Sequence, residues 1–359
     1  MRMAPPRNGS IPDDPREVAS ATAGDNGFRA LKAFEHRPWT TGSSIALLPG
    51  EQELVIADTA NHMIIVQTAD GKTVLKQIAV GRRPERLVVA PNGLVFVSNR
   101  GSRSISVVDP KRGIELRSVS AGVEPMGLAL TPDASTLLVT SSATAELLVF
   151  NASTLSLSYK LQLDTAWPVA VAAHPDGQRA YVSHMSGDKI QIIDLRRQKI
   201  AGSLTLPNQD TGLPGRLQGR FMPKRTANAA ASLVVSPGGH RLHVAHVMVN
   251  TGVHRSASLG RGGYGMGAPS PIEATVATFD LDKGELMRPP VKFEGRGDGM
   301  ASTADAHAQT MAQPVAVIHD PRSARLFMVG HGCDRVMEMD AAKSDPITHP
   351  NGIWMVGQA

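Results

Sequence analysis

The stretch VFVSNRGSRSISVVD, residues 95–109, predicts a β-hairpin. Apolar residues cluster in VFV and alternate in ISVV, and the residues between them are polar, which is the pattern of strand, turn, strand. A segment of equal length, AYVSHMSGDKIQIID at residues 180–194, has nearly the same order of apolar and polar residues. The hairpin is therefore a repeated unit, and the repeat is the first guide to how the chain is built.

The same 15-residue frame recurs along the chain. Residues 137–151 and 326–340 fit it closely, and residues 54–68 fit it more loosely. A sixth copy opens at residues 242–246 and resumes at residues 273–280 after a long insertion. The alternative, an all-β sandwich of unrelated hairpins, does not require one frame to recur.

A turn signal precedes each copy, because a proline follows an apolar run and Gly, Asn or Asp follows that proline in five of the six cases. The first three spacings between these prolines are 42, 41 and 43 residues, and the later spacings are 62 and 84, which insertions explain. The prolines are Pro49, Pro91, Pro132, Pro175, Pro237 and Pro321.

A period near 42 residues with four short strands per unit is typical of a β-propeller blade. One unit cannot bury its apolar face, so neighbouring units must stack around an axis. The sequence therefore predicts an all-β fold, a β-propeller of four-stranded blades with six blades visible. The six units begin near Pro38, Arg82, Val123, Ala166, Asn228 and Gln313.

Four short segments carry a resemblance to a known family. Residues 96–99 (FVSN) and 181–184 (YVSH) each precede a polar turn and a strand that ends in Asp, and residues 80–84 (VGRRP) and 121–125 (AGVEP) open the next units. This pattern resembles the YVTN β-propeller repeat and covers residues 38–359. The family includes binding, surface and redox-associated proteins. The resemblance implies a periplasmic or secreted protein, although no signal peptide is visible in this sequence.

The segments NAAASLVVSPGGHRLHVAHVMVNTG and QPVAVIHDP resemble bacterial YVTN propellers that precede a c-type cytochrome domain. That resemblance implies a redox context with a haem module beyond residue 359. The chain has one cysteine and no Cys-x-x-Cys-His motif, so it cannot attach a c-type haem itself. We predict no cofactor within this chain, apart from the metal ion considered below.

The two ends of the chain bear on the number of blades. Residues 1–37 are predicted to be a disordered lead that contains a spare outer strand at residues 28–36 (FRALKAFEH). The last residues, VGQA, match those that precede a new blade, so we expect a truncated seven-bladed ring. The alternative is a six-bladed ring closed by the spare strand. No apolar run approaches the ~18–20 residues of a membrane-spanning helix, so no membrane span is predicted.

Three insertions interrupt the repeat, at residues 207–229, 251–272 and 294–312. Because strands alternate in direction, all three fall on one face around the fifth unit, where long loops on a rigid scaffold usually carry function. The first two have net charges of +3 and +2, which together equal the +5 of the whole chain. Their basic residues form the candidate binding site: Arg216, Arg220, Lys224, Arg225, Arg255 and Arg261.

A basic surplus confined to one face attracts an anionic partner. We predict a protein partner or an anionic small molecule. Nucleic acid is not expected, because aromatic residues are only 4% of the chain and no stacking platform is visible. The predicted function is a non-catalytic scaffold, and no catalytic residue is assigned. The alternative is a propeller enzyme, lactonase- or hydrolase-like or a metal-centred oxidoreductase, that uses His and Arg residues of this face.

Four histidines are candidate metal ligands. His184 and His246 occupy the same slot of the frame, at the end of the second strand; His331 lies one residue past it, and His254 lies in the second insertion. Equivalent positions of blades form a ring, and imidazole suits Cu, Zn or Fe. The alternative is that these residues bond their own hairpins. The other units place Asp58, Asn99, Ser141 and Gly330 in this slot.

Two further side-chain predictions concern packing. His243 is expected to be packed and not to chelate with His246, because a spacing of three on a strand sends the two rings to opposite faces. Trp39, Trp167 and Trp354 open or close blades and are predicted to pack as wedges between them.

Overall fold

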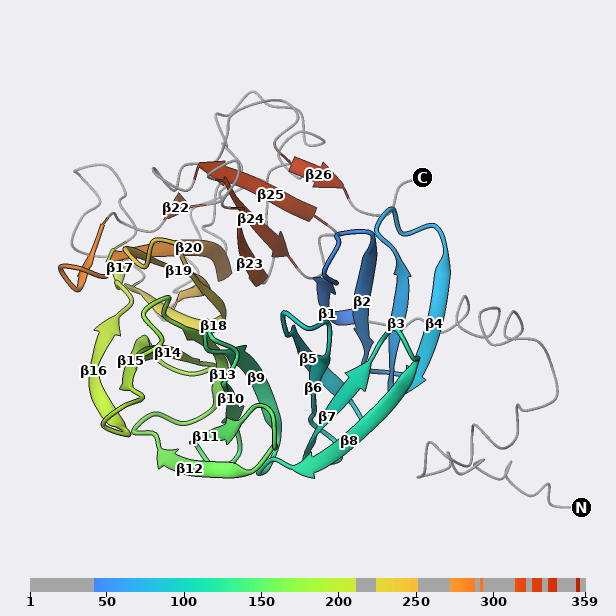
Figure 1. Cartoon of the computed structure of the whole chain (residues 1–359). Coiled ribbons are helices and arrows are strands. Elements are labelled where there is room, and N and C mark those ends of the chain that lie inside the picture. The colour runs from blue at the N-terminus through green and yellow to red at the C-terminus, as the bar shows by residue number, and fades with distance from the viewer. Residues whose placement is uncertain are drawn as a thin grey trace, which may run out of the picture. The chain divides into compact units, whose positions relative to one another are not determined.

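A computed structural model describes residues 42–210, 224–250, 272–287, 291–292, 314–320, 325–330, 335–340 and 353–355. All regular elements in these ranges are β-strands, which form six antiparallel sheets, here called blades one to six (Figure 1). The described residues contain no helix long and apolar enough to span a membrane. The chain divides into two compact units, residues 1–125 and 126–359, which are described separately.

The first unit contains blades one and two, each made of four consecutive strands in sequence order. Valines of both blades, among them Val55, Val66, Val95 and Val97, form one buried cluster, so the two sheets pack face to face. Blade one comprises β1 (Gly42–Leu47), β2 (Glu53–Asp58), β3 (Met63–Thr68) and β4 (Val74–Ala79). Blade two comprises β5 (Pro84–Val89), β6 (Val95–Asn99), β7 (Ser104–Asp109) and β8 (Ile114–Ser120).

The second unit contains blades three to six. Blade three comprises β9 (Pro125–Leu130, which begins at the boundary), β10 (Thr136–Ser141), β11 (Glu146–Asn151) and β12 (Leu157–Gln162). Blade four comprises β13 (Pro168–Ala173), β14 (Arg179–His184), β15 (Lys189–Asp194) and β16 (Lys199–Thr205). Blade five comprises β17 (Gln209–Asp210), β18 (Lys224–Val235), β19 (Arg241–Asn250), β20 (Ile272–Asp280), β21 (Glu285–Leu286) and β22 (Val291–Lys292). Blade six comprises β23 (Pro314–Asp320), β24 (Arg325–Gly330), β25 (Arg335–Asp340) and β26 (Ile353–Met355).

The predicted hairpin is confirmed in all six blades. Each copy of the 15-residue frame forms the second and third strands of a blade, as in β6 with β7 and β14 with β15. Each frame proline lies just after an inner strand. The all-β propeller is therefore the fold, and the sandwich alternative is wrong.

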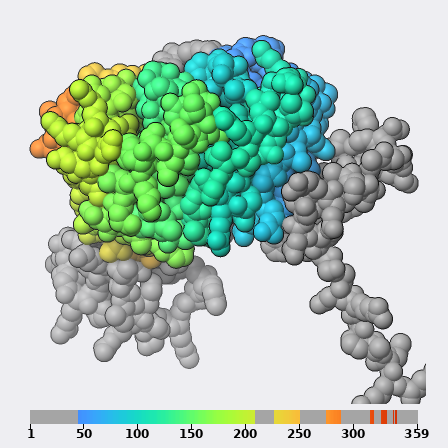
Figure 2. Space-filling view, turned by 60° about the horizontal axis from the view of Figure 1, so that its bottom comes forward, coloured from blue at the N-terminus to red at the C-terminus, as the bar shows by residue number. Residues whose placement is uncertain are grey.

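Blade four shows why the sheets must stack, because both of its faces are buried. Ala180 and Val182 of β14 pack into a cluster with Leu138 of blade three. Tyr181, which points to the opposite face, packs with Leu242 of blade five. The outer strands β12 and β16, green and yellow-green in Figure 2, are mostly exposed, with partly or fully buried side chains at alternate positions along most of their length.

A residue with positive φ precedes the inner strand in several blades. The residue before the inner-strand proline has a positive φ in three blades: 53° at Arg83, 54° at Glu124 and 59° at Trp167. Ala229 of β18 has the matching conformation, with φ of 47°. This left-handed conformation costs about 1–2 kcal/mol for a residue with a side chain. Its presence in four blades indicates that the propeller geometry requires it at the junction.

Two sequence predictions about segment boundaries change. The first insertion was expected to run to residue 229, but β18 begins at Lys224, because residues 225–228 pair with β19 and residue 224 pairs with β17. The second insertion was expected to include Ile272, which belongs to β20. The lead, the spare strand at residues 28–36 and residues 294–312 lie outside the described residues. The expectation of a truncated seven-bladed ring therefore stays a prediction.

A glycine in the β18–β19 turn, at the end of blade five opposite its long loops, provides a test of the packing between blades four and five. Gly239 has φ of 77°, and a Cβ there would lie 2.8 Å from the His174 ring, whose Nε2 is 2.9 Å from the Gly239 carbonyl oxygen. Gly284 has nearly the same φ, 70°, but a Cβ there would meet no atom within 4 Å.

We therefore expect Gly239→Ala to lower the free energy of unfolding more than Gly284→Ala. Both changes carry the left-handed penalty of about 1–2 kcal/mol, and only the first adds an overpacking cost of about 1–3 kcal/mol. Urea denaturation of the two variants and the parent measures the difference. Equal losses would contradict the contact between the two blades.

Candidate functional site

Blade five differs from the other blades at one end. Its strands β18, β19 and β20 have 12, 10 and 9 residues, whereas the inner three strands of blade four have 6 each. The extra length lies where the second-to-third-strand turns and the inter-blade segments meet. Residues 225–228 pair with residues 247–250 there, beyond a bulge at residues 229–231. The three strands thus form a twisted antiparallel ribbon, here called the blade-five ribbon (Figure 1).

The attachment points of all three insertions lie at this end. Asp210 pairs with Lys224, so the first insertion leaves and re-enters on neighbouring strands. Val249 pairs with Ile272, so the second insertion does the same on the next pair of strands, β19 and β20. The third follows β22, where Lys292 pairs with Thr275 near the same end of β20. The sheet register therefore brings the bases of the two basic insertions side by side.

The structure places only part of the predicted binding residues. Lys224 and Arg225 open β18, at the tip of the ribbon, and only their backbone is described. The other four candidates lie outside the described residues: Arg216, Arg220, Arg255 and Arg261.

The slot at the end of the second strand holds buried polar residues in five blades. Asp58 accepts hydrogen bonds from the backbone amides of its own turn at 3.1 and 3.0 Å. The Asn99 side-chain amide donates to Ser106 Oγ at 2.7 Å on the neighbouring strand. These contacts are those of residues that hold a hairpin together. The residues in the slot are Asp58, Asn99, Ser141, His184 and His246.

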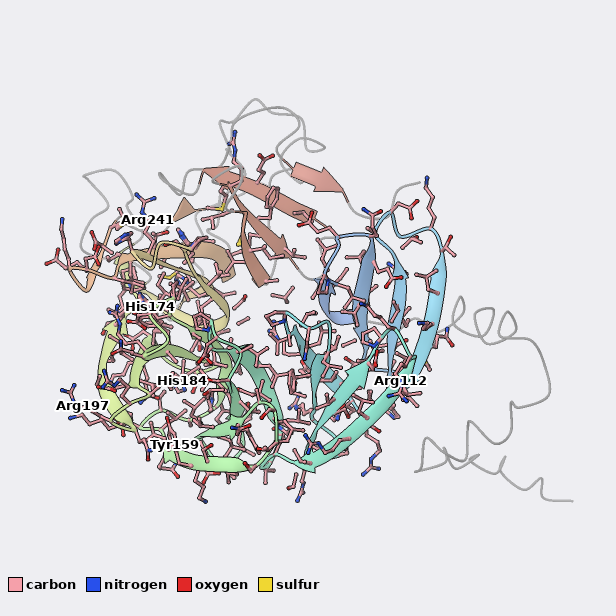
Figure 3. All side chains as sticks on the ribbon, in the orientation of Figure 1. Arg112, Tyr159, His174, His184, Arg197 and Arg241 are labelled. Atoms are coloured by element: carbon pink, nitrogen blue, oxygen red, sulfur yellow. The ribbon has the colours of Figure 1, made fainter. Side chains whose placement is uncertain are left out.

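The two histidines of this slot point into different interfaces. His184 is on the same face of β14 as Ala180 and Val182, which pack against blade three. His246 is on the same face of β19 as Val244 and Met248, which pack against blade four. Figure 3 shows His184 inside the second unit, within blade four. The structure does not bring the two rings together.

The remaining metal candidates, His254 and His331, lie outside the described residues. Within the part of the chain that the structure describes, no three His, Cys, Asp or Glu side chains are placed to hold a metal ion. His243 is buried, and its Nδ1 is 2.9 Å from Thr278 Oγ1 on the face of β19 opposite to His246, so the prediction that it packs is confirmed. A metal centre stays a prediction.

Burial shifts the charge state of both slot histidines. Burial in the blade interface lowers the pKa of His246 to about 4, although its Nδ1 donates to the Val244 carbonyl oxygen at 3.3 Å. Burial also lowers the pKa of His184, whose Nδ1 donates to the Ala166 carbonyl oxygen at 3.2 Å. Both rings are therefore neutral at pH 7 and act as packed, hydrogen-bonded core residues.

Trp167 departs from the sequence prediction. It was expected to pack as a wedge between blades, but 58% of its surface is exposed. Met185, which begins the turn after β14, is 39% exposed. Its backbone amide donates to the Trp167 carbonyl oxygen at 2.9 Å, so the two residues are neighbours at the end of blade four that faces the ribbon. The sequence did carry a signal, since the equivalent junction positions hold the charged residues Arg83 and Glu124, which favour exposure.

The opposite end of blade four carries a shallow hollow of about 470 Å³. It lies between the β13–β14 and β15–β16 turns and is lined by charged and polar residues. Arg179 Nε donates to Asp176 at 2.8 Å and Arg197 to Asp194 at 3.1 Å; Figure 3 shows Arg197 at the outer edge of the blade. Arg196 donates to Gln178 Oε1 at 3.4 Å. Because exposed ion pairs of this kind contribute little, these contacts indicate a solvated polar surface.

Comparison with known proteins supports the fold alone. No protein-family model and no curated protein matches this chain. Many solved structures do, among them the hydrazine synthase of Kuenenia stuttgartiensis, with a TM-score of 0.68 and 18% identity over 86% of this chain and 78% of that one. At this level of identity the similarity extends to the propeller architecture and not to activity.

The buried state of His246 predicts that stability falls in acid. In the unfolded chain a histidine has the ordinary pKa of 6.5, so between pH 6.5 and about 4 the unfolded state takes up a proton that the folded state refuses. The free energy of unfolding should therefore fall as the pH falls through this window, by up to about 3 kcal/mol at 1.36 kcal/mol per pH unit. Urea denaturation over this pH range measures the slope.

His246→Leu should flatten that slope, because it removes the titrating ring from an apolar interface. Met248→Leu is the matched control, since Met248 is buried on the same face of β19, carries no titrating group and should leave the slope unchanged. An unaltered slope in His246→Leu would show that other groups control the acid stability.

Proposed function

We propose that this chain is a non-catalytic propeller scaffold that binds an acidic protein surface or an anionic small molecule at the ribbon end of blades four and five. The observation that carries the proposal is that the attachment points of the two basic insertions lie on neighbouring strands of one sheet. These insertions hold the net positive charge that the rest of the chain lacks. A patch of one sign on a rigid base raises the local concentration of oppositely charged partners.

The arrangement also favours binding over catalysis. The buried polar residues next to the ribbon, such as His246, are neutral and enclosed between blades, where they cannot reach a substrate. The ribbon itself is held by the continuous β18–β19 register on both sides of its bulge, so it can present loops without rearrangement. A base that is already formed lowers the entropic cost of association.

The cellular context of the proposal rests on the YVTN resemblance. We propose a periplasmic or secreted protein that acts in an electron-transfer setting, with a haem module encoded beyond residue 359. The coding sequence past Ala359 tests this, because such a module requires a Cys-x-x-Cys-His motif.

The binding proposal predicts salt-dependent capture of acidic probes. Residues 211–223 can be replaced by Asn-Gly, because Asp210 and Lys224 are already paired and a two-residue turn closes such a pair. The replacement removes Arg216 and Arg220. We expect slower association of a fluorescent glutamate-rich peptide at low salt, and little difference at high salt, where the Debye length falls to about 3 Å at 1 M. Stopped-flow anisotropy measures both rates.

The matched control is Arg196→Gln with Arg197→Gln, which also removes two positive charges, but at the opposite end of blade four. It should leave the association rate nearly unchanged. If both variants slow association equally, only the net charge matters and the proposed site is wrong. If the replacement unfolds the protein in urea denaturation, the first insertion is structural and the proposal also fails.

A further inference from the structure

An exposed apolar pair lies beside the basic ribbon. Trp167 is 58% exposed and Met185 is 39% exposed. Their backbones are tied together, because the Met185 amide donates to the Trp167 carbonyl oxygen at 2.9 Å, and the Ala229 amide of β18 donates to the Met185 carbonyl oxygen at 3.0 Å. Blade four thus holds the pair against the base of the blade-five ribbon by two consecutive backbone hydrogen bonds.

The propeller does not require a tryptophan at this junction. The equivalent residues are Arg83, Glu124 and Ala229, and all of them adopt the same left-handed conformation. A large ring adds nothing to that backbone requirement, and Trp167 is absent from the buried clusters that the described residues of blades three to six form. The packing of the blades therefore gives no reason for the indole, which is held in one place by a constrained backbone and directed to solvent.

The apolar pair lies close to the tip of the blade-five ribbon, where Arg225 stands. Arg225 precedes Ala229 by four residues on β18, a separation of about 13 Å at 3.3 Å per residue. A protein partner of ordinary size covers about 800 Å² on each side, which is wide enough to contact both places at once. Exposed tryptophan is enriched among the residues that dominate binding energy, and methionine adapts its shape to a neighbouring apolar group.

We propose that Trp167 and Met185 form the apolar anchor of a docking surface whose occupant is an acidic protein segment that presents an aromatic or long aliphatic side chain. This inference rests on the proposed function and specifies its partner. The acidic residues of the segment face the tip of the blade-five ribbon, where Lys224 and Arg225 open β18, and its apolar side chain packs on the indole. A single-stranded nucleic acid fits less well, because such sites stack successive bases on several aromatic rings, and among the described residues Trp167 is the one exposed Trp, Tyr or Phe side chain.

The test uses two fluorescent glutamate-rich peptides that differ only at one central residue, Phe or Ala. We expect the Phe peptide to bind the parent protein about tenfold more tightly than the Ala peptide, as for loss of an anchor worth about 1.4 kcal/mol. In Trp167→Ala the two peptides should bind within about twofold of each other, because the Phe side chain has lost its contact. The variant should fold, since Ala229 already occupies the equivalent position with φ of 47°.

Leu157→Ala is the matched control, because Leu157 is 50% exposed on the outer strand β12, away from the ribbon. It should keep the full preference for the Phe peptide. A second measurement uses Trp39→Phe with Trp354→Phe, which leaves Trp167 as the one tryptophan of the chain's three. Its emission should shift to the blue when the Phe peptide binds.

The outcomes separate the two proposals. If both peptides bind equally well to the parent protein with a strong salt dependence, the anchor is wrong and the charge proposal stands. If neither peptide binds at low salt, both proposals fail. If an oligothymidylate quenches Trp167 and displaces the peptides, the surface binds nucleic acid and the acidic protein segment is the wrong occupant.

Discussion

Blades four and five each have two apolar faces, and a sheet cannot bury either of them by itself. Blade four depends on blade three to cover Ala180 and Val182, and on blade five to cover Tyr181. The close approach of sheets also restricts which side chains fit; a Cβ on Gly127 of blade three would lie 2.8 Å from the Ala170 Cα of blade four. Burial of apolar area is the main stabilising contribution in such a fold, so apolar side chains that pack against the neighbouring sheets fill the middle of a blade.

Function is consequently expected at the strand ends, where the packing requirement stops. The slot at the end of each second strand shows the transition, because its residues are polar and yet buried. Asp58 and Asn99 hold their own turns, and His184 and His246 are neutral rings that bond backbone carbonyl groups. Polar groups in such places are retained because leaving their partners unsatisfied would cost free energy. Recurrence of polar residues at equivalent blade positions is therefore better explained by the fold than by a shared ligand.

Three features of the candidate docking surface meet at the ribbon end of blade five. Its ribbon extends beyond the junction, the bases of the insertions meet on adjacent strands, and an exposed tryptophan lies beside it on blade four. Charge brings a partner near over a distance of about a Debye length, whereas an apolar anchor gives binding energy only in contact. Their proximity on one rigid base is the physical argument for one docking surface.

The sequence alone determined the propeller, its six hairpin frames, the turns at the frame prolines and the face that carries the insertions, because these follow from local periodicity and turn chemistry that neighbours on the chain supply. It also placed His243 and His246 on opposite faces. Three features needed the tertiary structure: where β18 begins, into which interface each slot histidine points, and whether Trp167 is buried. These depend on strand register and on the neighbouring blade, and the same residue types fit both outcomes. A tryptophan before an inner strand becomes a wedge or an exposed anchor according to what the next blade places against it.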